Sequence, residues 1–145
     1  MERIYTESEI VEVAQEILGN IGVGGNTAPL LAFSGDLGAG KTTLTKAIAK
    51  ALGVEEEITS PTFVIAKIYN TGHHAFAKLV HVDAYRIEGI AELGPLDFDT
   101  YLADPKNLVI VEWPEMIPEK IAQHANTHLY SIEHVDNESR RIHKK

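Results

Sequence analysis

The sequence predicts one α/β domain spanning residues 1–145, and three observations support this. Residues 30–33 and 108–112 are short and almost wholly apolar, as is typical of strands buried on both faces. A glycine-rich turn and a helical segment follow the first of these runs directly. A chain of 145 residues with 44% hydrophobic content can close one core and is short for two.

The amino-terminal part predicts a helix, a loop and then a strand. Thr6 followed by Glu9 is a capping-box pattern, and apolar residues recur at helical spacing as far as residue 18, which indicates an amphipathic helix. Residues 19–29 contain four glycines and are expected to form a loop. That loop leads into the apolar strand at residues 30–33.

A second helix and a β-hairpin are expected next. The helix should run from about residue 41 to residue 52, because Gly53 stands where a left-handed C-cap is common. Residues 62–69 are rich in β-branched and aromatic types, and residues 78–83 are a further strand candidate. The turn residues 70–72 between them predict a hairpin.

The last third predicts short helices between strands. Residues 90–102 should form two helical stretches broken at Gly94 and Pro95. Pro114 and Pro118 exclude a long helix after the second apolar strand. The remaining strands are expected at residues 108–112, 128–134 and 140–143.

The composition excludes several classes of protein. Without cysteine there is neither a disulfide framework nor a thiolate metal or redox site. The formal charge of -8 opposes direct association with a nucleic-acid backbone. No long apolar run and no signal-peptide pattern are present, so a soluble, cytoplasmic protein without membrane contact is expected.

Residues 35–42 read GDLGAGKT and match the phosphate-binding pattern G-x-x-x-x-G-K-[ST] in full. The glycines let successive N–H groups point at phosphate oxygens. Lys41 would neutralise the β- and γ-phosphates of ATP, and Thr42 offers its hydroxyl to Mg²⁺. The residues expected to contact the nucleotide here are Asp36, Leu37, Gly38, Ala39, Gly40, Lys41, Thr42 and Thr43.

A magnesium site also needs a carboxylate at the end of a neighbouring strand. Asp83 ends the run LVHVD, and Glu112 ends the run LVIVE. The pattern alone does not rank them: Asp83 also fits a turn or a helix cap, and Glu112 a solvated strand end. His81 shares a strand face with Asp83 and is placed to orient it, although a core histidine is the more ordinary interpretation.

Three other residues are candidates for the same site. Thr62, in TSPT, stands where a switch segment contacts the γ-phosphate in many such enzymes, and it equally fits a proline-stiffened turn. Trp113 is either a core residue or a wall of the nucleotide pocket. Arg86 is either a stabiliser of transferred charge or the partner of a surface carboxylate.

Three functions compete at this point: an ATPase acting on a partner, a GTPase, and a small-molecule kinase. A GTPase usually reads guanine with an N/T-K-x-D element, which the carboxy-terminal half lacks. A kinase commonly holds donor and acceptor with several arginines, and only Arg86 lies away from the chain ends. A kinase phosphorylating a small-molecule acceptor is the alternative to a partner-coupled ATPase.

The motifs GDLGAGKTTL, TSPTF, HVDAYR and VEWPE, in this order between residues 30 and 115, resemble the TsaE family. The family is the P-loop ATPase required for N6-threonylcarbamoyladenosine (t6A) synthesis on bacterial tRNA. The run GIAELGPLDFDTYL departs from the family pattern, because Pro95 follows Gly94.

The resemblance implies a P-loop NTPase-like three-layer sandwich whose mostly parallel sheet carries an inserted β-hairpin. It implies a Mg²⁺-dependent ATPase, weak alone, that acts with the TsaB–TsaD complex, contacting TsaD, to allow multiple turnovers, with tRNA reached only through that complex. The catalytic residues it implies are Lys41, Asp83 and Glu112. Thr42 and Glu112 would hold the metal, and Thr62 and Trp113 would lie at the nucleotide.

Overall fold

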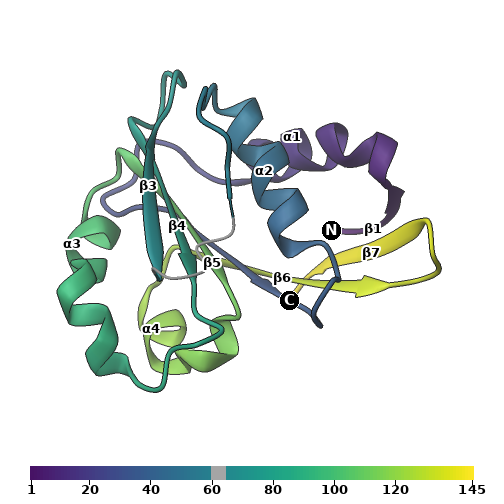
Figure 1. Cartoon of the computed structure of the whole chain (residues 1–145). Coiled ribbons are helices and arrows are strands. Elements are labelled where there is room, and N and C mark those ends of the chain that lie inside the picture. The colour runs from purple at the N-terminus through teal and green to yellow at the C-terminus, as the bar shows by residue number, and fades with distance from the viewer. Residues whose placement is uncertain (60–64) are drawn as a thin grey trace.

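The computed structural model describes residues 1–59 and 65–145, and in them seven strands form one sheet (Figure 1). The strand order across the sheet is β1-β7-β6-β2-β5-β4-β3. The strands are β1 Glu2–Thr6, β2 Leu30–Ser34, β3 Ala66–Asn70, β4 Lys78–Asp83, β5 Asn107–Glu112, β6 Thr127–His134 and β7 Ser139–Lys144.

The sheet is parallel at its centre and antiparallel at both edges. Strands β6, β2, β5 and β4 run parallel to one another. The β3–β4 hairpin closes one edge, as expected, and β6, β7 and β1 form antiparallel pairs at the other. "Mostly parallel" therefore describes the four central strands, and the sheet as a whole is mixed.

Helices cover both faces of the sheet (Figure 1). Helices α1 and α2 lie on one face, and α3 and α4 lie on the other with the 3-10 helices η2 and η3. The helices are η1 Glu7–Glu9, α1 Ile10–Asn20, α2 Lys41–Ala51, η2 Ile90–Leu96, α3 Phe98–Ala103, η3 Pro114–Met116 and α4 Pro118–Gln123.

The two core layers follow from the alternation of side chains along each strand. In β2, Leu31 and Phe33 pack toward α1 and α2. Leu30 and Ala32 pack toward the opposite helical layer. Since all four side chains are fully buried, β2 is the doubly covered strand that its apolar run predicts.

The start of α1 and the end of α2 agree with the local sequence signals, whereas α1 runs on to Asn20, into the stretch 19–29 expected to form a loop. The Thr6 N–H donates to Glu9 Oε2 at 2.8 Å, which confirms the capping box ahead of α1. Gly53 follows α2 with a φ of 79°, and a Cβ there would lie 3.2 Å from the backbone of Gly72. Only glycine combines this φ with so close an approach of the β3–β4 turn.

The expected helix break at Gly94 and Pro95 is wrong. Pro95 lies inside η2, and the chain instead turns at Asp97, which has a φ of 56°. The Asp97 N–H donates to the Gly94 carbonyl at 3.1 Å. Proline's missing N–H is tolerated here because a short 3-10 turn needs few hydrogen bonds.

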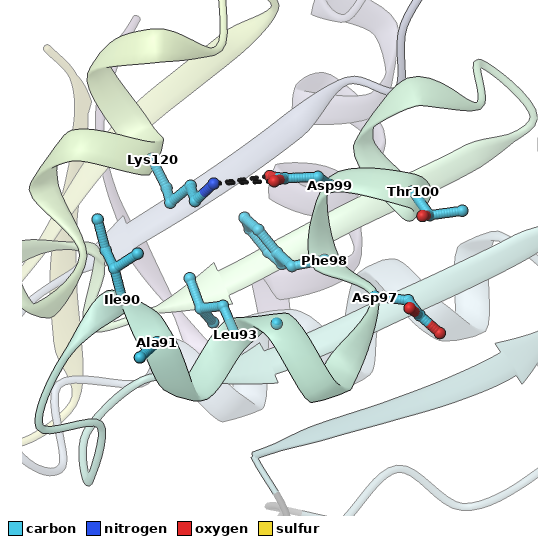
Figure 2. A pocket seen from close by; sticks show the side chains of 9 residues that line it. Ile90, Ala91, Leu93, Asp97, Phe98, Asp99, Thr100 and Lys120 are labelled. Atoms are coloured by element: carbon cyan, nitrogen blue, oxygen red, sulfur yellow. Dashed lines mark hydrogen bonds and ion pairs between the residues drawn. The ribbon is translucent and has the colours of Figure 1, made fainter.

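Lys120 of α4 forms an ion pair with Asp99 of α3, the helix that follows this turn. Lys120 Nζ lies 2.9 Å from Asp99 Oδ1, and Figure 2 shows this ion pair above Phe98, with the Asp97 side chain pointing away. Phe98 and Leu93 are buried in the layer beneath. The ion pair and the apolar floor together fix η2 and α3 against α4.

Candidate functional site

The predicted phosphate loop and both predicted carboxylates meet at one edge of the sheet. Phe33 of β2 is the register partner of Glu112 in β5, and Glu112 is the register partner of Asp83 in β4. The three strands are parallel, so their carboxyl ends lie side by side. Open α/β sheets bind ligands at this edge.

The glycines of the loop have separate roles. Gly35 has a φ of 156°, and a Cβ there would collide with the Ile132 carbonyl oxygen of β6. Gly38 and Gly40 have φ values of 77° and 108°, and a Cβ at either would point into open space. Gly35 is therefore needed for packing, and the other two for loop conformation.

The other loop residues frame the start of α2. The Ala39 N–H donates to the Asp36 carbonyl at 3.0 Å, and Ala39 is buried. Asp36, Leu37 and Thr43 are exposed. The N-cap Gly40 provides no side-chain cap, so the first N–H groups of α2 are available to a ligand.

Lys41 is buried directly behind this loop. Its Nζ donates to the carbonyl oxygens of Gly35, at 2.5 Å, and Asp36, at 2.9 Å. The same atom lies 4.1 Å from the centre of the Trp113 ring. Burial lowers the pKa of the ammonium, and nearby carboxylates, Glu112 first among them, oppose that shift.

Glu112 connects α2 to β4. Its Oε1 accepts a hydrogen bond from Thr42 Oγ1 at 2.8 Å, and its Oε2 lies 2.5 Å from His81 Nε2. Glu112 is only 2% exposed, so the alternative of a solvated strand end is wrong. His81 is fully buried and contacts Glu112, which corrects the expectation that it orients Asp83.

Asp83 and Tyr85 form a local turn after β4. Asp83 Oδ1 accepts the Tyr85 N–H at 3.0 Å, so the turn interpretation of Asp83 describes its hydrogen bond. Its half-exposed carboxylate is adjacent in register to Glu112. Arg86 is exposed in the same loop.

Trp113 packs partly against the core and also lies beside Lys41. Its backbone is left-handed, with a φ of 61°, a conformation that is costly for a bulky residue. One part of the side chain packs against the core layer of α3, and the ring lies 4.9 Å from that of Tyr85. Thr62 falls outside the described residues.

A separate hollow of 340 Å³ lies between η2, α3 and α4 (Figure 2). Its lining includes Leu93, Phe98 and Lys120, and it shares no residue with the glycine loop. Among residues 1–59 and 65–145, no three His, Asp or Glu side chains gather as a metal-binding group. No helix in that part of the chain has the length and apolar character to span a bilayer.

Sequence reasoning missed two features of the site. The bond between His81 and Glu112 joins two strands whose register no local pattern specifies. Tyr85 was not expected beside Trp113. A signal for the first existed, because two apolar strands that both end in a carboxylate are natural neighbours in a parallel sheet.

Fold and site together define an α/β protein in which a glycine-rich loop, a buried lysine and a threonine–glutamate pair meet at the ends of parallel strands. The family model described as "Threonylcarbamoyl adenosine biosynthesis protein TsaE" matches residues 4–142. The chain belongs to the TsaE family, which confirms the resemblance seen in the motifs.

Several relatives of this chain carry the name of the same family. The chain is 42% identical over 114 residues to the "tRNA threonylcarbamoyladenosine biosynthesis protein TsaE" of Mycobacterium bovis, covering 74% of this chain and 67% of the relative. The proteins of that name from Streptomyces coelicolor and Bacillus subtilis are 45% and 43% identical. Each of these two alignments covers 65% of this chain, and they cover 62% and 56% of the respective relative.

A solved structure is also similar. Its title is "Crystal structure of Bacillus subtilus YdiB", and it aligns with a TM-score of 0.68 at 28% identity. The alignment covers 98% of this chain and 82% of that one. The likeness therefore extends over both edges of the sheet as well as its centre.

Proposed function

We propose that this chain binds ATP with Mg²⁺ and hydrolyses it, weakly by itself, in the synthesis of t6A on tRNA. In this proposal it acts with the TsaB–TsaD complex and allows that complex to turn over repeatedly. The observation that carries the proposal is the 2.8 Å hydrogen bond between Thr42 and Glu112, beside Lys41. We also propose that the fold is a P-loop NTPase-like three-layer sandwich. Helices cover both faces of the sheet, and the glycine loop lies between β2 and α2.

The loop fits a polyphosphate. Lys41 Nζ is held by two backbone carbonyls and an aromatic face, so it can turn to a phosphate without breaking an ion pair. The uncapped start of α2 adds N–H donors and the positive end of the helix dipole. Open space at Gly38 and Gly40 leaves room for phosphate oxygens close to the backbone.

The pair formed by Thr42 and Glu112 fits Mg²⁺. A hydroxyl and a carboxylate oxygen are hard ligands, and here they are already neighbours. Bound Mg²⁺ would neutralise charge on the β- and γ-phosphates during transfer to water. Asp83, at the adjacent strand end, is the second carboxylate, which we assign to holding water.

Contact with a protein partner is supported by apolar side chains around the site. Leu37, Tyr85 and Met116 follow β2, β4 and β5, and they are 68%, 45% and 43% exposed. The net charge of -8 disfavours direct binding to tRNA. We therefore propose that tRNA is reached through the TsaB–TsaD complex, with TsaD contacted at this edge.

The test is a reconstituted reaction. Purified TsaB and TsaD are mixed with tRNA, ATP and the threonylcarbamoyl donor, and t6A formed per TsaD is counted with and without this chain. We expect more than one product per TsaD with the wild-type chain, and no such gain with Lys41→Ala. The variant Lys46→Ala, exposed on the same helix, is the control. Phosphate transfer to a small metabolite, with no gain in turnovers, would favour the kinase alternative.

A further inference from the structure

His81 is a buried imidazole whose role the ATPase proposal leaves open. It lies on β4, paired in register with Ile110 of β5. Glu112 is two residues beyond Ile110 and so shares its face of the sheet. The two side chains therefore meet diagonally across the parallel strands, with the His81 ring fully buried.

The proposed metal role of Glu112 assigns which ring nitrogen carries hydrogen. A metal-binding carboxylate is ionised and only accepts hydrogen bonds, so His81 Nε2 is then the donor to Glu112 Oε2. The other nitrogen, Nδ1, is buried and has no hydrogen-bond partner within residues 1–59 and 65–145. Within that part of the chain, the one polar contact of the ring is therefore directed at Glu112.

Both carboxylate oxygens of Glu112 are thereby engaged. Oε2 contacts the His81 ring from β4, and Oε1 accepts a hydrogen bond from the Thr42 hydroxyl of α2. A carboxylate held at one oxygen cannot rotate freely about its last bond. The oxygen facing Thr42, which would hold Mg²⁺ in the proposed function, is thus presented in one orientation.

We propose that His81 is a positioning residue that orients Glu112 toward the magnesium ion bound with the nucleotide. This rests on the proposed function, because it assumes that Thr42 and Glu112 hold the metal. A buried polar nitrogen without a hydrogen-bond partner is unfavourable, so an apolar side chain would suit this core position better than an imidazole. Its placement is explained by the hydrogen bond that it donates to Glu112.

Two substitutions separate the roles of the ring nitrogens. In His81→Gln the side-chain amide nitrogen is as many bonds from Cα as Nε2, so the donor to Glu112 is kept. In His81→Asn the amide nitrogen takes the place of Nδ1, and that donor is lost. His124→Gln is the matched control, because His124 Nε2 contacts the Ala28 carbonyl, away from the loop.

The measurement is Mn²⁺ binding to the full chain in the presence of ADP, followed by electron paramagnetic resonance, alongside ADP affinity in EDTA. We expect His81→Asn to weaken Mn²⁺ binding by roughly 10-fold, as loss of an outer-shell partner usually does. Affinity for ADP in EDTA should not change, and His81→Gln and His124→Gln should bind Mn²⁺ as the wild type does.

The outcomes separate this proposal from the one beneath it. Wild-type Mn²⁺ affinity in His81→Asn overturns the positioning role alone, as does an equal loss of ADP affinity in both His81 variants. A wild-type chain that binds neither ADP nor Mn²⁺ overturns the ATPase proposal and this one with it.

If His81→Asn does not fold, nitrogen NMR of the wild-type chain labelled at histidine decides the question. A ring hydrogen on Nε2 that shifts in Glu112→Gln supports the proposal. A neutral ring carrying its hydrogen on Nδ1 overturns it.

Discussion

Thr42 Oγ1 lies 2.8 Å from Glu112 Oε1 and thereby joins the first turn of α2 to the end of β5. The two residues are far apart in sequence and come from two different motifs. Their contact brings the glycine loop and the strand-end carboxylate into one arrangement.

Replacing Lys41 with alanine should lower the affinity for ATP roughly 10- to 100-fold, since hydrogen bonds from a charged group contribute about 1.5–3 kcal/mol. Isothermal titration calorimetry with Mg²⁺ present measures this change. Lys46→Ala removes the same charge from an exposed position of α2 and should bind ATP normally. Equal affinity in Lys41→Ala and wild type would exclude the glycine loop as the phosphate site.

Glu112→Ala and Asp83→Ala should both reduce ATP turnover. The loss of stability should be larger for Glu112→Ala. Glu112→Ala leaves the buried Nε2 of His81 without its acceptor, which should lower the free energy of unfolding by about 1–3 kcal/mol. Asp83→Ala loses a half-exposed turn bond to Tyr85, at a cost of about 1 kcal/mol or less. Urea denaturation and a phosphate-release assay measure the two effects. A loss of stability without a loss of turnover in folded protein would make the carboxylates structural.

Two glycine-to-alanine changes should act in opposite directions. Gly35→Ala places a Cβ against the Ile132 carbonyl, and such overpacking usually costs about 1–3 kcal/mol. Gly19 lies within α1 with open space around it. Alanine there should raise the free energy of unfolding by about 0.5–1 kcal/mol, because alanine has the higher helix propensity. Thermal unfolding of both variants checks the signs. A Gly35→Ala protein as stable as wild type would refute the close contact of the loop with β6.

Asp136 should make the β6–β7 turn sensitive to acid. Hydrogen bonds from the N–H groups of Glu138 and Ser139 lower the pKa of its carboxyl group. A depressed folded-state pKa gives stability that is present above the unfolded value and lost as pH falls through the folded one. The stability difference between wild type and Asp136→Asn should therefore be constant near neutral pH and shrink below about pH 4. Chemical denaturation across that range measures it, and a difference that grows on acidification would contradict the assignment.

Most elements could be predicted because their signals are local. The capping box at Thr6, the glycine after α2 and the apolar run of β5 each specify structure within a few residues. The break after η2 could not be placed correctly. Asp97 adopts a left-handed conformation, and no residue type required the turn to fall there. The role of Thr62 and the division of the chain into one domain stay predictions.

The sequence by itself determined that a glycine loop, a lysine and a threonine follow a buried strand, and that two later strands end in carboxylates. Tertiary structure alone decided how these parts meet. Strand register placed Glu112 between Thr42 and His81, whereas Asp83 accepts a hydrogen bond from Tyr85 in the turn after β4. It also turned residues 2–6 into an edge strand, because β7 from the other end of the chain supplies their hydrogen bonds. The physical reason is that periodicity and turn chemistry act over a few residues, whereas register depends on the packing of two helical layers against the whole sheet.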